Sequence, residues 1–296
     1  MRLISYDDLG GVIRLGVESA GRAIAADQLL PGGPATMAAL LAGGDASLDA
    51  LRSAADPARI ERDGRPVGEL RLRAPVPRPG KVVAIGRNYP DHVAENAGAP
   101  VPKSPLIFAK WPSCVIGHGD EIRWDPELTS QVDYEAELAV VIGRTARRVA
   151  EADALSYVLG YTCLDDISAR DLQFGDGQWV RGKSLDTFCP IGPAIVTADE
   201  IADPDDLGIF CTVNGTVVQT ARTSEMYFSV ARIISHCSEA FTLEPGDVIA
   251  TGTPAGVGAF QKPPRFLADG DQVTISIEGI GDLVNVCRFD GAAARG

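Results

Sequence analysis

The segment DYEAELAVVIG, residues 133–143, decides what fold to expect. Its second half, residues 138–142, is an unbroken apolar run of the kind found in buried strands. Its first half places Glu135 and Glu137 two residues apart, and side chains two apart in a strand point to the same side. Two carboxylates beside a core are costly unless something compensates their charge. The segment therefore predicts a buried strand whose two acids face an arginine, water or a metal ion.

Outward from this segment, the chain from Lys81 onward is rich in strand candidates separated by Gly, Pro and Asp turns. They are KVVAIG, SPLIFAK, YVLGYTCLDD, PAIVTA, LGIFCTVNG, GDVIATGTP and QVTISIEG. Helix candidates are fewer and cover residues 91–97, 151–157 and 224–239, the last with Ser224 as its N-cap. Because strands outnumber helices and do not alternate with them regularly, we expect a β-rich mixed α/β fold rather than a doubly wound sheet.

The chain is expected to divide near residue 72. Residues 1–72 alternate short strand-like pieces with a helix around TMAALLAGG, and they contain no chemical motif. The stretch that follows, LRAPVPRPGKVVAIG, carries prolines at positions 75, 77 and 79, which favour an extended link. We therefore expect a small N-terminal α+β domain over residues 1–72 and a catalytic domain over residues 73–296.

Composition narrows the class of protein. The 296 residues carry a formal net charge of -13, which disfavours binding to nucleic acid or to an anionic membrane surface. Six cysteines without a CxxC spacing and only three histidines argue against a zinc-finger or disulfide framework. The first residues show no signal-peptide pattern, and no apolar run reaches 18 residues. We expect a cytoplasmic protein that binds neither nucleic acid nor membrane.

Five blocks, in order, resemble the fumarylacetoacetate hydrolase family. They are AIGRNYPDHVAENA (84–97), DYEAELAVVIGRTAR (133–147), LDDISARDLQ (164–173), QWVRGKSLDTFCPIGP (178–193) and LEPGDVIATGTPAGVG (243–258). The chain looks most similar to bacterial members that act on acylpyruvates, 2-hydroxyhepta-2,4-diene-1,7-dioates and diketo-sugar acids. The resemblance implies a mixed β-sandwich or roll with few helices, a variable N-terminal domain and a homodimer.

The resemblance also implies that Glu135, Glu137 and Asp166 bind a divalent cation, Mg²⁺ or Mn²⁺. Three carboxylates call for a compensating charge, and a hard dication prefers oxygen ligands. Magnesium takes about six oxygens, so about three positions would remain for substrate and water. The alternative for the two glutamates, from their spacing alone, is a solvated strand end. The neighbouring Asp165 is interpreted as structural, in an Asx turn.

The resemblance places further residues around a substrate. Lys183 would stabilise negative charge on an enolate, Gln173 would contact the substrate, and Thr253 in the loop TGTPAG would bind its carboxylate. Each has an ordinary alternative: a surface lysine, a surface glutamine, or a tight turn rich in small residues. Arg170 and Asp186 are expected as backbone or charge partners around this site.

The block GRNYPDHVAENAG suggests a lid over the site. His92 and Glu95 are three residues apart and would share one face of a helix that Pro90 opens and Gly98 ends. In the family, such a pair closes over the site, with Glu orienting the imidazole and His activating water. The alternative is an exposed helix with a chance pair. Residues expected near the substrate are Arg87 and Tyr89, and those interpreted as structural are His118 and His236.

Together these assignments predict a metal-dependent hydrolase that cleaves a C–C bond in a 2,4-dioxo acid, an acylpyruvate or diketo-sugar acid, through a metal-stabilised enolate. The same enolate also supports isomerisation or decarboxylation of the 2-oxo and 2-hydroxy-diene-dioates of aromatic catabolism. Those reactions are the alternative function. A binding protein that keeps the fold without the chemistry is a third possibility, against which the retained carboxylates, Lys183 and the lid pair argue.

Overall fold

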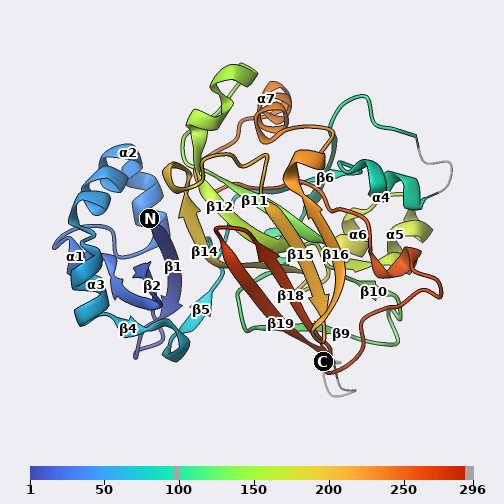
Figure 1. Cartoon of the computed structure of the whole chain (residues 1–296), viewed down its shortest axis with the longest axis horizontal. Coiled ribbons are helices and arrows are strands. Elements are labelled where there is room, and N and C mark those ends of the chain that lie inside the picture. The colour runs from blue at the N-terminus through green and yellow to red at the C-terminus, as the bar shows by residue number, and fades with distance from the viewer. Residues whose placement is uncertain (97–99, 291–296) are drawn as a thin grey trace.

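A computed structural model describes residues 1–96 and 100–290. The main body of the molecule is a long mixed sheet that a second, smaller sheet covers on one side, with helices at the periphery (Figure 1). Short 3₁₀ helices occur in the connections, at η1 (Val67–Glu69), η2 (Pro112–Cys114), η3 (Glu151–Tyr157), η4 (Ala198–Glu200), η5 (Thr223–Glu225) and η6 (Gly258–Phe260). The β-rich mixed α/β fold expected from the sequence is confirmed.

One half of the long sheet is formed by strands that the sequence predicted. In sheet order they are β14 (Cys189–Thr197), β12 (Val158–Asp165), β11 (Ala136–Ile142), β17 (Val248–Ala250), β6 (Val82–Gly86) and the edge strand β7 (Leu106–Lys110). The short strand β8 (Val115–Ile116), which was not predicted, pairs with β14. Every residue of β11 is buried, because side chains from its two faces enter two different apolar clusters. Burial on both faces explains why this strand is continuously apolar rather than alternating.

The second sheet packs on one face of the long sheet, against β11, β12 and β14. Its order is β16 (Thr216–Arg222), β15 (Gly208–Val213), β18 (Gln272–Ile277), β19 (Gly281–Phe289) and β9 (Glu121–Trp124). Leu138 of the long sheet and Ile209 and Ile275 of the second sheet belong to one buried cluster. A short two-stranded ladder, β10 (Val132–Asp133) with β13 (Ser168–Ala169), joins the segments that precede β11 and follow β12.

The N-terminal segment extends the long sheet. Its elements are β1 (Arg2–Asp7), β2 (Ile13–Ser19), β3 (Arg22–Ala25), α1 (Ala26–Leu29), α2 (Met37–Ala54), α3 (Pro57–Asp63), β4 (Arg65–Pro66) and β5 (Arg71–Arg73). Figure 1 shows them gathered at one side of the molecule. Strand β1 pairs antiparallel with β14 through Arg2 with Val196 and Leu3 with Ile195. The first 72 residues therefore share a sheet with the rest, and their division into a separate domain stays a prediction.

The helices of the second part of the chain are short. They are α4 (Pro90–Glu95), α5 (Arg170–Asp176), α6 (Val180–Lys183) and α7 (Val230–Ala240). The predicted N-cap of α7 is wrong, because the helix begins after Ser229, whose side chain accepts from Arg232 N, while residues around Ser224 form η5. The predicted stop at Gly98 lies outside the described residues. Within residues 1–96 and 100–290, no helix is long and apolar enough to cross a membrane.

Candidate active site

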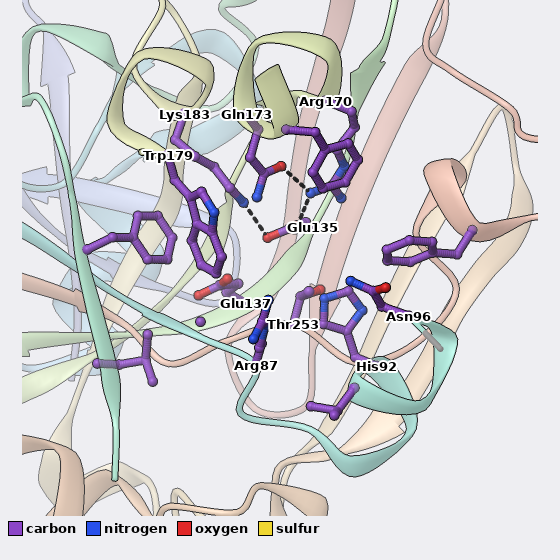
Figure 2. A pocket seen from close by; sticks show the side chains of 16 residues that line it. Arg87, His92, Asn96, Glu135, Glu137, Arg170, Gln173, Trp179, Lys183 and Thr253 are labelled. Atoms are coloured by element: carbon purple, nitrogen blue, oxygen red, sulfur yellow. Dashed lines mark hydrogen bonds and ion pairs between the residues drawn. The ribbon is translucent and has the colours of Figure 1, made fainter. Parts of the chain in front are cut away.

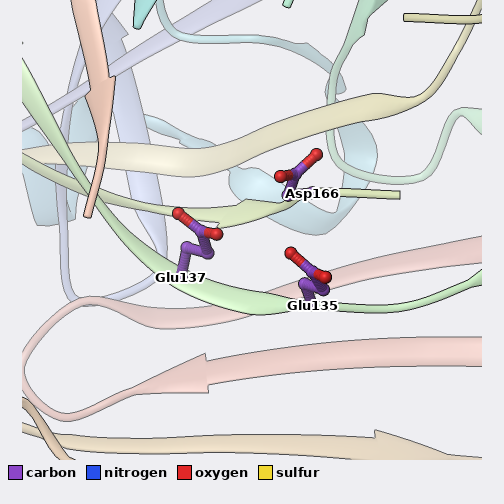
Figure 3. A group of neighbouring side chains, drawn as sticks. All are labelled: Glu135, Glu137 and Asp166. Atoms are coloured by element: carbon purple, nitrogen blue, oxygen red, sulfur yellow. The ribbon is translucent and has the colours of Figure 1, made fainter. Parts of the chain in front are cut away.

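Three carboxylates meet where β11 begins and β12 ends (Figure 3). The register that pairs Ala136 with Asp165 places Glu135 and Glu137 opposite the chain that turns away from β12 at Asp166. Oxygens of the three side chains lie within 4.8 Å of one another, and all three residues are buried. The cluster that the sequence predicted is therefore assembled from two strands that are adjacent in the sheet but about 30 residues apart in sequence.

Three buried cations surround these acids. Lys183 Nζ lies 2.7 Å from Glu135 Oε2 and 2.8 Å from Asp166 Oδ2. On the far side of Asp166, Lys110 donates to Oδ1 and to the backbone oxygens of Ile167 and Lys183. Arg170 Nη1 lies 2.6 Å from Glu135 Oε1. Each cation therefore touches at least one of the three carboxylates or the chain that carries them.

Glu137 is the acid that these cations leave unpaired. Its carboxylate accepts the N–H of Gly252 at 2.7 Å, and burial together with the charges of Asp166 and Glu135 raises its pKa well above the ordinary value. Burial also acts on Glu135, but Lys183 and Arg170 outweigh it and lower the pKa of that residue. The cluster thus has one side neutralised by protein cations and one side with excess negative charge.

The residues fit a divalent cation. Among the described residues, five buried carboxyl groups face three buried cations here; the eight residues are Asp133, Glu135, Glu137, Asp165, Asp166, Lys110, Arg170 and Lys183. With every one of them ionised the excess is two negative charges, and without a cation, burial raises the pKa of Glu137 and Asp165 instead. A dication would balance that excess, and an all-oxygen donor set suits Mg²⁺ or Mn²⁺ rather than zinc. Glu135, Glu137 and Asp166 are the residues that would hold it.

A cavity of about 60 Å³ opens above the carboxylates (Figure 2). Its charged and polar lining comes from Arg87, His92, Asn96, Glu135, Glu137, Arg170, Gln173, Lys183 and Thr253, and its aromatic lining from Phe108, Phe174, Trp179 and Phe260. The structure therefore brings together, in one cavity, residues from all five of the sequence blocks quoted above.

The lid pair lies at this cavity. His92 Nδ1 is 2.8 Å from Glu95 Oε2, and Glu95 Oε1 accepts the N–H of Gly256 at 2.8 Å. Because a carboxylate only accepts, the Nδ1–H of His92 donates to it, and Nε2 is the ring nitrogen left free to take a proton. Helix α4 is thereby tied to the loop that follows β17.

Polar groups of Gln173, Thr253 and Arg170 remain available to a ligand. Gln173 Oε1 accepts from Arg170 at 3.0 Å, which leaves its amide nitrogen as a donor. Thr253 Oγ1 accepts from Gln219 Nε2 at 2.8 Å, which leaves the hydroxyl proton to donate. Arg170 Nη2 is buried and has no hydrogen-bond partner in the described structure. A carboxylate or keto oxygen is the natural acceptor for such donors.

Three other predicted residues lie elsewhere. Tyr89 is fully buried behind the lid, does not line the cavity, and its hydroxyl has no partner among the described residues. Asp186 is exposed and away from the cavity. Asp165 is structural, but it forms no Asx turn: its Oδ1 accepts the N–H of Glu135 at 2.9 Å from the neighbouring strand.

Sequence reasoning missed four residues that build the site. Lys110 holds Asp166, Trp179 lines the cavity, and Gln219 holds both Thr253 and the N–H of Ala136 at 2.9 Å. Asp133 accepts from Arg170 Nε at 2.8 Å and from Gly258 N at 2.7 Å, so it fixes both the arginine and η6. The position of Lys110 at the end of the apolar strand SPLIFAK was an available signal, but its partner Asp166 is 56 residues away in the sequence.

Comparison with known proteins gives a consistent family and several activities. Residues 81–288 match the family model described as fumarylacetoacetate (FAA) hydrolase C-terminal. The mitochondrial oxaloacetate tautomerase FAHD2A of Bos taurus is 45% identical over 291 residues, covering 96% of this chain and 91% of that protein.

Two solved structures share the fold over nearly the whole chain. A fumarylacetoacetate hydrolase from Exiguobacterium antarcticum is 39% identical with a TM-score of 0.84, covering 98% of this chain and 100% of the other. A maleylpyruvate hydrolase from Sphingobium sp. SYK-6, in complex with manganese(II) and pyruvate, is 34% identical with a TM-score of 0.79 at the same coverage. Because the family model covers residues 81–288 and these relatives match nearly the whole chain, the chain belongs to the fumarylacetoacetate hydrolase family.

Proposed function

We propose that this enzyme interconverts the keto and enol forms of a 2-oxo acid with the help of a divalent metal, and that oxaloacetate is the first substrate to test. The observation that carries the proposal is that His92, whose Nε2 is free, lines the same small cavity as Glu135 and Glu137, two of the three clustered carboxylates. The similarity to an oxaloacetate tautomerase over 96% of the chain supports the same reaction.

The metal, when bound by Glu135, Glu137 and Asp166, would make the α-proton of a 2-oxo acid more acidic by polarising the keto group. The protein's own donors then orient the substrate. Arg170 Nη2 and the Gln173 amide offer hydrogen bonds to its carboxylate and keto oxygens, and Thr253 offers one from the opposite loop. Lys183 supplies a buried positive charge beside the carbon skeleton on which enolate charge develops.

Proton transfer falls to the lid pair. His92 Nε2 can take the proton from C3 of the keto form, after which the imidazolium or water gives a proton to the enolate oxygen to form the enol; the reverse transfers restore the keto form. Glu95 holds the opposite ring nitrogen and stabilises the imidazolium that forms, while Gly256 fixes Glu95 in turn. No attacking water is required for this proton transfer.

Cleavage of a C–C bond by water is the second candidate. It was the activity expected from the sequence, and the structural similarity to a maleylpyruvate hydrolase favours it. The same imidazole would then activate water instead of taking a carbon-bound proton. The two functions share the metal ligands and differ in what His92 deprotonates.

The deciding experiment follows both reactions on one preparation loaded with Mg²⁺ or Mn²⁺. We expect the wild-type enzyme to accelerate decay of the oxaloacetate enol, followed by its ultraviolet absorbance, without releasing cleavage products from a panel of acylpyruvates analysed by mass. His92→Ala should slow tautomerisation by about 10²–10⁴. His236→Ala, a histidine in α7 outside the cavity, is the matched control and should retain activity. Efficient acylpyruvate cleavage with negligible tautomerisation would replace the first candidate by the second.

A further inference from the structure

The geometry points to Arg87, held on the indole of Trp179, as the residue that recognises a second carboxylate on the substrate. We propose that this pair makes the site selective for short 2-oxo dicarboxylic acids over 2-oxo monocarboxylic acids. The inference rests on the proposed function for the identity of the site. It adds that the second carboxylate of the substrate is recognised, and that Arg87 and Trp179 recognise it.

Arg87 differs from the other cations of the cavity in its lack of an ion-pair partner among the described residues. Lys183 and Arg170 are both engaged with buried carboxylates. The half-buried Arg87 lines the same cavity and has no hydrogen-bond or ion-pair partner anywhere in residues 1–96 and 100–290. A guanidinium with all its donors free, partly shielded from water, is suited to bind a carboxylate through two parallel hydrogen bonds.

Trp179 determines where that guanidinium lies. The Arg87 guanidinium carbon lies over the Trp179 ring, 5.7 Å from its centroid, an arrangement in which the ring face attracts the cation. Arg87 itself adopts a left-handed backbone conformation with φ 60°. A bulky residue tolerates this backbone only where its surroundings fix it. The residue is therefore held in place from both the backbone and the side-chain end.

The indole is itself a rigid platform. It packs directly on Gly86, where an added Cβ would lie 2.5 Å from a ring carbon of Trp179. The indole also makes an edge-on ring interaction with Phe108, with centroids 5.3 Å apart. Gly86 is the last residue of β6, Arg87 follows it, and Phe108 lies on β7. The two strands that border the cavity therefore hold the tryptophan in place. Trp179 thus acts as a positioning residue for Arg87.

The placement of the cations separates the two ends of a substrate. In Figure 2, Gln173, Arg170, Lys183 and Trp179 lie above Glu135 and Glu137, and Arg87 lies below Glu137, with the indole of Trp179 extending down toward it. A 2-oxo acid whose keto acid end is held by the first group presents its far end to Arg87. The small volume of the cavity keeps that far end short.

The test measures discrimination between a diacid and a monoacid that differ at the far end alone. Oxaloacetate and 2-oxobutanoate are compared by exchange of their C3 protons for deuterium, followed by NMR, in the metal-loaded enzyme. Arg87→Met should lower the ratio of kcat/KM for the diacid to that for the monoacid by roughly 10- to 100-fold, mainly through KM. Arg87→Lys should retain part of the preference, since it keeps the charge without the planar fork.

Trp179 is tested through the same ratio. Trp179→Leu removes the platform and should lower the diacid preference by roughly 3- to 10-fold, whereas Trp179→Phe should restore most of it. Trp111→Leu replaces an exposed tryptophan outside the cavity and serves as the matched control that leaves the ratio unchanged. A merely structural role for Trp179 would depress both substrates equally.

A binding measurement tests this proposal independently of the proposed function. 3,3-Difluoro-oxaloacetate and 3,3-difluoro-2-oxobutanoate have no C3 proton to exchange, so calorimetry with them reports recognition without catalysis. A loss of diacid preference in Arg87→Met by calorimetry supports the proposal even if the enzyme tautomerises neither natural acid. Equal weakening of both ligands, or an unchanged ratio, overturns it.

Discussion

Lys110 and Lys183 hold the two oxygens of one carboxylate, that of Asp166. Lys183 Nζ binds Oδ2 at 2.8 Å, while Lys110 binds Oδ1 from behind. The ammonium group of Lys110 has three protons, and Asp166 and two backbone oxygens accept them all. Unlike Lys183, it has no donor left for a ligand. Its role is to fix the carboxylate, and through the backbone oxygen of Lys183 it also fixes the end of α6.

Replacing Lys110 by methionine should therefore destabilise the metal-free protein. Removing one member of a buried ion pair leaves an uncompensated charge, which costs about 3–5 kcal/mol in the free energy of unfolding. A bound dication would give Asp166 a new counter-charge, so saturating Mg²⁺ or Mn²⁺ should recover part of the loss. Urea denaturation with and without metal measures both effects.

Arg123→Met is the control for Lys110→Met. Arg123 pairs with Glu121 and Asp290 in a half-exposed position, where an ion pair contributes about 1 kcal/mol or less. Its loss should be small and should not respond to metal. If Lys110→Met denatured at the wild-type urea concentration, the fixing role of Lys110 would have to be abandoned.

Glu137→Gln separates metal binding from folding. In the absence of metal, burial and two neighbouring carboxylates raise the pKa of Glu137, with a single backbone N–H as its hydrogen-bond partner. A neutral amide relieves that repulsion, so the metal-free variant should be at least as stable as the wild type. Its affinity for Mg²⁺ or Mn²⁺, measured by calorimetry, should fall because one anionic ligand is lost.

The wild-type enzyme gives the complementary result. Chelator in excess should abolish activity, and added Mg²⁺ or Mn²⁺ should restore it. Full activity after exhaustive chelation, or unchanged metal affinity in Glu137→Gln, would remove the carboxylate cluster as the metal site.

The strands and the common direction of Glu135 and Glu137 could be predicted because their signals are local, whereas Asp166 was joined to them only through the family resemblance. The apolar run of β11 and the two glutamates before and within it occupy one short segment, and the spacing of two sets their common direction. Strand β19 was missed, because polar Asn285 occupies one of its buried positions and the residues between the buried positions, such as Arg288, are half-buried. Such a strand has a weaker apolar signal than one buried on both faces.

The remaining site residues could not be predicted because their partners are distant. Lys110 and Asp166 are 56 residues apart, and Gln219 reaches Ala136 across 83 residues. Contacts between residues so far apart in the sequence cannot be predicted from local hydrophobic pattern, helix or strand propensity, or turn residues. The commitment of Arg170 to Asp133, Glu135 and Gln173 likewise depends on how three segments pack together.

The start of α7 shows how two similar local signals compete. Both Ser224 and Ser229 precede helical sequence, but Ser229 Oγ accepts from Arg232 N, whereas Ser224 bonds Asp206 on the surface. Ser229→Ala should therefore lower the free energy of unfolding by about 0.5–2 kcal/mol. Ser224→Ala should change it by less than about 0.5 kcal/mol. Thermal or urea denaturation compares them, and equal effects would contradict the assigned helix start.

Lys183 offers the sharpest separation of catalysis from metal binding. Its ammonium group shares Glu135 and Asp166 with the metal that those residues would hold. Lys183→Met removes a cation that competes for these ligands, so the affinity for Mg²⁺ or Mn²⁺ should stay the same or increase. Turnover should nevertheless fall, because the positive charge beside the developing enolate is lost. Removal of one such electrostatic group costs about 10²–10³ in kcat.

The decisive measurement is therefore a pair of titrations on one variant. Metal affinity by calorimetry and kcat and KM for oxaloacetate tautomerisation should move independently, with the loss in kcat rather than in KM, since the charge that Lys183 meets develops along the reaction. Lys103→Met, a lysine outside the cavity, controls for the loss of a positive charge in general. A rise in KM at constant kcat would instead assign Lys183 to binding the substrate carboxylate. Weakened metal binding would show that Lys183 supports the ligand geometry rather than the reaction.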